Sequence, residues 1–184
     1  FVLSVLTQES GLDGAIGANL GKCYYNTPWK NREGVVMNKT QTQSYLALLS
    51  GLNPPLDPKK TPVSCPISKD GAYGGAMGPG QFMPTSWWDI KNGTGYKKRV
   101  EKITGNVPAS PFNNLDAFTA TALYLSDALE KCEKVYSSKY NQEACAAARY
   151  YAGNNWSKHF GGYGKKVANR AIEFQKDIDV LDSE

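Results

Sequence analysis

The chain opens on the segment FVLSVLTQESG, from Phe1 to Gly11, in which an apolar pattern ends on one carboxylate. Val2, Val5 and Glu9 are separated by three and four residues. In a helix this spacing places all three side chains on one face, so the segment predicts a helix whose apolar face continues to Glu9. Gly11 is expected to end the helix, because glycine readily adopts the left-handed conformation that closes a helix C-terminus.

Glu9 is the main candidate for a chemical role. A carboxylate on an apolar helix face is either paired or poorly solvated, and poor solvation raises its pKa. A raised pKa is what a general acid needs near neutral pH. The alternative is an ordinary glutamate that faces water near the end of a helix, and the local pattern is equally compatible with it.

Length and composition are typical of one globular domain. With 184 residues the chain can bury a substantial core, and we expect residues 1–184 to form a single domain. The net charge of +4 is spread along the chain without a dense basic block, so nucleic acid is not an expected partner. No apolar run reaches the roughly 20 residues that span a bilayer. Because the sequence begins inside the expected first helix, we interpret it as a fragment of a longer protein, and we expect a monomer.

Four cysteines, Cys23, Cys65, Cys132 and Cys145, lack the closely spaced pairs of a zinc site. We therefore expect two disulfides. Three connectivities are possible, and pairing of Cys23 with Cys65 and of Cys132 with Cys145 is favoured because each pair encloses one local segment. Disulfides persist in oxidising compartments, which predicts an extracytoplasmic location: periplasm, cell envelope or secreted. The alternative is four reduced structural cysteines in a cytosolic protein.

Hydrophobic periodicity predicts a mainly α protein with long irregular loops. Helices are expected over residues 40–52, 97–103, 141–152 and 165–181, and a further helix should begin at Pro84 or Thr85. A long helix should have Asn114 or Asp116 as its cap and run to about residue 134. Residues 161–164 are expected to form a turn, and no pattern predicts a strand longer than about four residues.

Two helices have inward faces that the spacing defines residue by residue. For the long helix these residues are Phe118, Ala122, Leu125 and Leu129. For the last helix they are Val167, Ala171, Phe174 and Ile178.

Most catalytic schemes are excluded by what the chain lacks. His159 is its one histidine, no Gly-x-Ser-x-Gly motif occurs, and the even cysteine count leaves no obvious free thiol. A surface imidazole beside Phe160 is the favoured interpretation of His159. No residues have metal-ligand spacing, so no metal site is expected. The glycine-rich string over residues 75–85 lacks the Lys-Ser/Thr of a phosphate-binding loop and follows no strand. Acid and base catalysis by a carboxylate remains.

Aromatic residues are numerous enough to offer stacking surfaces for sugar rings. The candidates are Tyr24, Tyr25, Trp29, Tyr73, Trp87, Trp88, Tyr150, Tyr151, Trp156 and Tyr163. Aromatic side chains also build protein cores, so about half of these are expected to serve packing alone.

Three segments then point to a family. They are Glu9-Ser10 at the end of the first helix, Gly75-Ala76-Met77-Gly78-Pro79-Gly80-Gln81-Phe82-Met83-Pro84, and Arg149-Tyr150-Tyr151-Ala152-Gly153. In this order they resemble the three signature motifs of lytic murein transglycosylases, and the stretch from the first to the last covers most of the chain. The middle string is closest to that of the membrane-bound B-type enzymes, and the third resembles the soluble type. The resemblance implies a lysozyme-like fold of the goose-type lysozyme/SLT kind.

The resemblance also implies roles for individual residues. Glu9 matches the catalytic acid and base, and Ser10 matches the hydroxyl that contacts it or the substrate. Tyr150 matches the tyrosine that faces the catalytic glutamate. Tyr151 stands where the family usually has asparagine, so the substrate contact at this position differs.

The middle string supplies the remaining substrate-binding candidates. Met77 and Gly78 match the substrate-side loop, which extends to Gly80. Gln81 matches the glutamine that lines the cleft, and Phe82 follows it in the motif.

The implied reaction is cleavage of the β-1,4 bond between MurNAc and GlcNAc in peptidoglycan, without a cofactor. Ordinary glycosidases use two carboxylates, and the nearest acidic residue, Asp13, lies beyond Gly11 at an unpredictable position. One glutamate suffices if the N-acetyl carbonyl of MurNAc stabilises the cation. Glu9 would protonate the glycosidic oxygen and then take the proton of the C6 hydroxyl, leaving a 1,6-anhydroMurNAc end.

Two alternatives stay open at this point. One is a hydrolytic muramidase of the lysozyme type, and the other is a non-catalytic module for peptidoglycan binding or assembly. Peptidoglycan strands are the expected partner in each case. Partners in a cell envelope or secretion machine would bind through regions outside this sequence.

Overall fold

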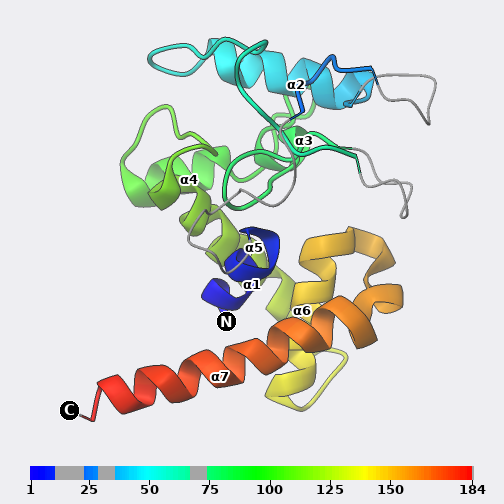
Figure 1. Cartoon of the computed structure of the whole chain (residues 1–184), viewed down its shortest axis with the longest axis vertical. Helices are drawn as coiled ribbons and strands as arrows, with labels where there is room; N and C mark the ends of the chain where they lie inside the picture. The colour runs from blue at the N-terminus through cyan, green and yellow to red at the C-terminus, as the bar shows by residue number, and fades with distance from the viewer. Residues whose placement is uncertain (11–22, 29–35, 67–73, 184) are drawn as a thin grey trace. The chain divides into compact units, whose positions relative to one another are not determined.

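The computed structural model describes residues 1–10, 23–28, 36–66 and 74–183, with Ser10 described by its backbone alone (Figure 1). Gly11, Asp13, Trp29 and Tyr73, for which the sequence makes predictions, lie outside these residues. The described part is mainly helical, as predicted. It has no strands, and its only β-type pairings are isolated bridges between Cys23 and Val63, Met77 and Phe82, and Asp89 and Thr94.

The helices follow the predicted periodicity closely. They are α1 (Val2–Ser10), α2 (Lys39–Ser50), α3 (Pro84–Trp87), α4 (Lys97–Thr104), α5 (Asn114–Glu133), α6 (Lys139–Ala152) and α7 (Lys165–Leu181). Between α6 and α7 the chain forms a 3-10 helix, η2 (Gly153–His159), and a π-helix, η3 (Phe160–Gly164). The turn predicted for residues 161–164 is therefore wrong, because these residues continue a helical path from α6 into α7.

The cap of α5 differs from the prediction, and one of the predicted cap residues binds the loop before the helix instead. Asn113 caps the helix, since its Oδ1 accepts a hydrogen bond from the Asp116 N–H at 3.2 Å. Asp116 is instead buried, and its carboxylate accepts from Asn106 Nδ2 at 2.8 Å and from the Ser110 N–H at 2.9 Å. A carboxylate that satisfies two loop donors ties the segment between α4 and α5 to the helix.

The described residues form two compact units. One consists of residues 1–8 and 121–184, and the other of residues 9–120. The division falls inside α1 and inside α5. The expectation that residues 1–184 form one domain stays a prediction.

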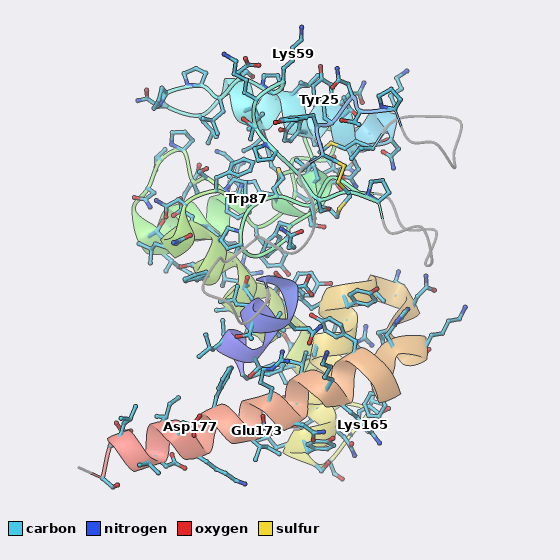
Figure 2. The ribbon with its side chains drawn as sticks, viewed as in Figure 1. Tyr25, Lys59, Trp87, Lys165, Glu173 and Asp177 are labelled. Carbon is cyan, nitrogen blue, oxygen red and sulfur yellow. A yellow bond between two sulfur atoms is a disulfide. The ribbon has the colours of Figure 1, made fainter. Side chains whose placement is uncertain are left out.

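The core of the 9–120 unit is built on α2. Its fully buried side chains include Val36, Met37, Tyr45, Leu48, Leu49 and Trp87; Trp87 is labelled in Figure 2. The Tyr45 hydroxyl donates to the Thr61 carbonyl at 2.8 Å, and burial raises the pKa of Tyr45 well above its usual range. One turn before Tyr45, near the start of α2, the Gln41 amide accepts from the Thr85 N–H at 3.0 Å and donates to Thr85 Oγ1 at 2.8 Å, which fastens α3 to α2.

The core of the other unit is built on small residues of α6. Ala144, Ala146, Ala147 and Ala148 are fully buried, and Leu125 of α5 and Val167 of α7 pack in the same unit. Gly164 is buried, and a Cβ atom there would lie 2.3 Å from the Ala144 carbonyl oxygen. The close approach of η3 to α6 therefore depends on the absence of a side chain at position 164.

Two predicted inward faces need correction. In α5 the buried residues include Ala117, Thr121, Leu125 and Ala128, whereas Ala122 is exposed, so the buried face begins one residue earlier than predicted. In α7 the buried residues lie between Val167 and Ala171, Phe174 is half-buried, and Ile178 is 45% exposed. Lys165, Glu173 and Asp177 lie on the exposed surface of this helix (Figure 2).

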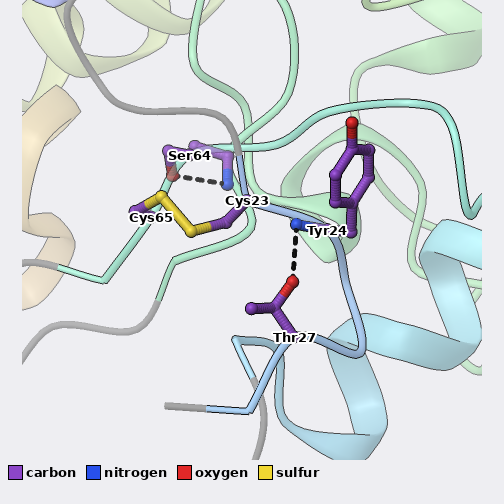
Figure 3. The surroundings of a disulfide bond; sticks show 6 residues. Cys23, Tyr24, Thr27, Ser64 and Cys65 are labelled. Atoms are coloured by element: carbon purple, nitrogen blue, oxygen red, sulfur yellow. Dashed lines mark hydrogen bonds between the residues drawn. A yellow bond between two sulfur atoms is a disulfide. The ribbon is translucent and has the colours of Figure 1, made fainter. Parts of the chain in front are cut away.

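Both predicted disulfides are confirmed. Cys23 and Cys65 are joined with an S–S distance of 2.00 Å, next to the bridge between Cys23 and Val63 (Figure 3). Cys132 of α5 and Cys145 of α6 are joined with an S–S distance of 2.05 Å. The first closes a segment of the 9–120 unit, and the second closes the hairpin between α5 and α6.

None of the helices in the described part of the chain is long and apolar enough to cross a bilayer.

Candidate active site

Glu9 lies in the last turn of α1, as predicted. Four residues before it, Val5 is fully buried, and the neighbouring Ser4 and Leu6 are also buried. Glu9 itself is half-buried. The middle of α1 is therefore buried, and the Glu9 carboxylate lies at the partly exposed end of the helix. Ser10 is the last residue of α1 and follows Glu9 directly.

The loop of the middle motif, which is predicted to lie on the substrate side, is a tight hairpin. Met77 and Phe82 exchange two backbone hydrogen bonds, from the Met77 N–H at 2.9 Å and from the Phe82 N–H at 3.2 Å. The side chains of Met77 and Phe82 are buried, with exposed fractions of 0% and 4%. The Phe82 ring contacts the edges of Trp87 and Tyr96 at centroid distances of 5.7 and 5.8 Å. These two predicted substrate-binding residues therefore anchor the hairpin, and the residues between them form its tip.

The glycines of this string are required by close backbone contacts. Gly78 has a φ of +60°, and a Cβ atom there would lie 1.8 Å from the Pro111 carbonyl oxygen. Gly75 has a φ of +104°, and a Cβ atom there would lie 2.6 Å from Met37 Cγ. The first contact holds the hairpin tip against the loop before α5, and the second holds its base against the core.

Gln81 is the most unusual residue of the hairpin. Its φ is +52°, in the left-handed region that non-glycine residues rarely adopt. Its N–H and its Nε2 both donate to the Gly78 carbonyl oxygen, at 3.1 and 2.7 Å. The amide oxygen, Oε1, is buried and has no hydrogen-bond donor among the described residues. A strained backbone that orients an unsatisfied amide is a feature found at ligand-binding sites, because the strain must be maintained by the surrounding structure.

Tyr150 lies on α6 and faces α5 within its unit. Its hydroxyl is 3.2 Å from Thr121 Oγ1, and its ring meets the Tyr124 ring edge-on at a centroid distance of 5.0 Å. The Tyr124 hydroxyl donates to the Arg149 carbonyl at 2.9 Å, and burial raises the pKa of Tyr124 above its usual value. These contacts fix the position of the Tyr150 hydroxyl on a rigid helix pair.

Tyr151 points to a different group of rings. It is 38% exposed, stacks on Tyr163 of η3 at a centroid distance of 4.6 Å, and meets His159 of η2 edge-on at 4.9 Å. Tyr151, which stands where the family that the sequence resembles usually has asparagine, is thus part of a partly exposed ring cluster. His159 is half-buried against this cluster, so the interpretation as an imidazole beside Phe160 omitted its main contact.

The predicted residues thus fall into two groups. Met77, Gly78, Gln81 and Phe82 meet in one hairpin of the 9–120 unit, to which Glu9 also belongs, and Tyr150 and Tyr151 lie in the other unit. The sequence did not identify Thr121 or Pro111, which position Tyr150 and Gly78. Neither carries a local signal, because each acts on a residue more than twenty positions away.

No group of three or more histidine, cysteine, aspartate or glutamate side chains that could hold a metal ion occurs within the described ranges. Comparisons of the chain with protein-family models, with curated proteins and with solved structures found no match. A function is therefore inferred from the residues and their geometry.

Proposed function

We propose that this chain is a lytic transglycosylase domain with a lysozyme-like fold that cleaves peptidoglycan outside the cytoplasm. The observation that carries the proposal is the conformation of Gln81. In a hairpin whose glycines are fixed by backbone contacts, this residue adopts a left-handed backbone and directs a buried, unsatisfied amide oxygen. The strain is located on the one polar side chain of the motif, where a substrate hydroxyl or N-acetyl N–H would supply the missing donor.

Glu9 would supply the acid and the base. Its place at the half-buried end of α1 suits a carboxyl group that gives a proton to the glycosidic oxygen and later accepts one from the C6 hydroxyl. The N-acetyl carbonyl of MurNAc would stabilise the positive charge that develops at C1, as in other substrate-assisted glycosidases. In the other unit, the Tyr150 hydroxyl, 3.2 Å from Thr121 Oγ1, would offer the substrate a hydrogen-bonding group.

The two disulfides support the proposed location. Disulfides form and persist in oxidising compartments. Both cysteine pairs are joined in the structure, and each closes a segment of the fold.

The test is digestion of purified peptidoglycan by the unaltered chain and by Glu9→Gln, with mass spectrometry of the released muropeptides. We expect the unaltered chain to give 1,6-anhydroMurNAc ends, and Glu9→Gln to lose cleavage by at least about a hundredfold, the usual lower range for general acid catalysis. Glu173→Gln, at an exposed position of α7, is the matched control and should cleave normally.

The products also separate the alternatives. Ends that are heavier by one water would indicate hydrolysis by a muramidase. Binding of peptidoglycan without any cleavage by the unaltered chain would indicate a non-catalytic module. Near-normal cleavage by Glu9→Gln would overturn the proposed mechanism.

A further inference from the structure

Arg149, the residue before Tyr150 in α6, is a half-buried cation for which the described residues supply no anion. Its guanidinium carbon lies 4.8 Å from the centroid of the Trp156 ring. Its Nε is buried and has no hydrogen-bond partner among the described residues. No carboxylate of the described chain forms an ion pair with it. The contact with Trp156 is therefore its principal interaction.

Lys97 provides a comparison, because it has both an aromatic partner and a carboxylate partner. Lys97 also lies over an indole ring, that of Trp88, at 5.4 Å, and it forms an ion pair with the half-buried carboxylate of Glu101. A cation that is partly removed from water is normally compensated in this way, because desolvation disfavours an isolated charge. Arg149 has the aromatic partner but lacks the carboxylate.

The surroundings hold Arg149 in one place. The Tyr124 hydroxyl donates to the Arg149 carbonyl at 2.9 Å, and η2 begins four residues later and brings Trp156 under the guanidinium. An aromatic ring on one face of a guanidinium leaves the edge of its plane available, and this edge matches the two oxygens of a carboxylate. Within the described part of the chain, the terminal nitrogens of Arg149 are not among the buried atoms without a hydrogen-bond partner.

We propose that Arg149, supported by Trp156, binds a carboxylate of the peptide stem that MurNAc carries. This inference rests on the proposed function and names the part of the substrate that this position recognises. A sugar bound beside Tyr150 would carry its lactyl-linked peptide next to the adjoining residue. Two extended residues span at most about 7 Å, which confines the first carboxylate of the stem to the neighbourhood of the sugar that carries it.

The test measures binding rather than cleavage, and it uses two probes. The first is N-acetylmuramoyl-L-Ala-D-isoGln with a free terminal carboxylate, and the second is the same compound with that carboxylate amidated. Calorimetric titration is carried out on the full chain in three forms: unaltered, Arg149→Met and Lys158→Met. Methionine keeps the aliphatic stem that packs on Trp156, and Lys158 is an exposed cation of the same 3-10 helix, so its loss changes the net charge equally.

We expect Arg149→Met to bind the carboxylate probe about tenfold more weakly than the unaltered chain, the loss typical of one hydrogen-bonded charged partner. Lys158→Met should bind it normally. The amidated probe should bind the unaltered chain and Arg149→Met alike. Arg149→Lys, which keeps the charge but loses the planar fork, should recover only part of the affinity.

Equal binding of the carboxylate probe by the unaltered chain and Arg149→Met would overturn the inference, as would an equal loss in Lys158→Met or no measurable binding by the unaltered chain. If Arg149→Met does not give the circular dichroism spectrum of the unaltered chain, Arg149→Lys decides, and full affinity of that variant overturns the role of the fork. This test can fail independently of the test of the proposed function. If the chain binds the probe through Arg149 but does not cleave glycan, only the proposed enzymatic activity is refuted.

Discussion

Gln81 combines two features that seldom occur together in one residue. Its backbone is in the left-handed region, and its amide nitrogen is used to bond the Gly78 carbonyl within the same turn. A left-handed conformation costs an ordinary residue roughly 1–2 kcal/mol. Glycine would form this turn without that cost. The presence of glutamine is therefore explained by what its side chain does at the tip of the hairpin.

The backbone strain at Gln81 can be tested without reference to activity. Gln81→Gly and Gln81→Ala both remove the amide bond to Gly78, but only glycine relieves the left-handed strain. We expect Gln81→Gly to be more stable than Gln81→Ala by about 1 kcal/mol in urea unfolding. In a position with ordinary φ the order would be reversed, since glycine is then the more destabilising residue. That reversed order would contradict the conformation described here.

The sequence could identify Gln81 as a candidate but could not predict its conformation. The motif gives the residue type, whereas the left-handed φ depends on Gly78, which the Pro111 carbonyl holds in place from thirty-three positions away. Arg149 is a similar case. It begins the third of the motif-like segments, yet its contact with Trp156 requires the 3-10 helix η2, for which periodicity gives no signal.

At the scale of elements, the connection between α6 and α7 depends on one glycine. The π-helix η3 passes so close to α6 that position 164 has no space for a Cβ atom, which would lie 2.3 Å from the Ala144 carbonyl oxygen. Gly161 and Gly162, in the same π-helix, have no atom within 4 Å of such a position. The three glycines are alike in sequence but differ in what surrounds them.

This difference gives a matched pair of substitutions. We expect Gly164→Ala to destabilise the fold by about 1–3 kcal/mol, the range for overpacking against a structure that cannot move aside. Gly161→Ala should change the free energy of unfolding by less than about 0.5 kcal/mol, because the added methyl group meets nothing. Chemical denaturation of both variants checks this. Equal effects of the two substitutions would show that η3 does not approach α6 at Gly164.

The elements also show which predictions periodicity can make. All the predicted helices are present, because each carries an apolar pattern of its own or a proline at its start. The predicted faces are less accurate. The spacing predicts that Ala122 and Ile178 point inward, whereas the buried positions near Ala122 are Thr121 and Leu125, and only the first half of α7 is buried. An apolar residue at helical spacing defines a possible face, and the packing partner decides which face is buried.

For the whole molecule, the disulfides are the covalent links between distant parts of each unit. Cys23–Cys65 joins residues 42 positions apart in the 9–120 unit, and Cys132–Cys145 joins residues 13 positions apart in the other unit. The pairing was predictable because each pair encloses one local segment. In the chain-entropy description a crosslink stabilises the fold by limiting the unfolded chain, and the effect grows with the length of the closed loop.

The two links should therefore differ in what they contribute. Loops of these lengths correspond to at most about 4 kcal/mol for Cys23–Cys65 and at most about 3 kcal/mol for Cys132–Cys145. We expect the double variant Cys23→Ala/Cys65→Ala to lose more stability than Cys132→Ala/Cys145→Ala. Alanine is suitable in both cases, since it adds no polar group at the fully buried positions 132 and 145. Urea unfolding followed by circular dichroism measures both losses, and thiol titration of each folded variant verifies that the remaining pair is oxidised. A larger loss for the shorter loop would show that packing around Cys132 and Cys145 between α5 and α6, rather than chain entropy, determines what these crosslinks contribute.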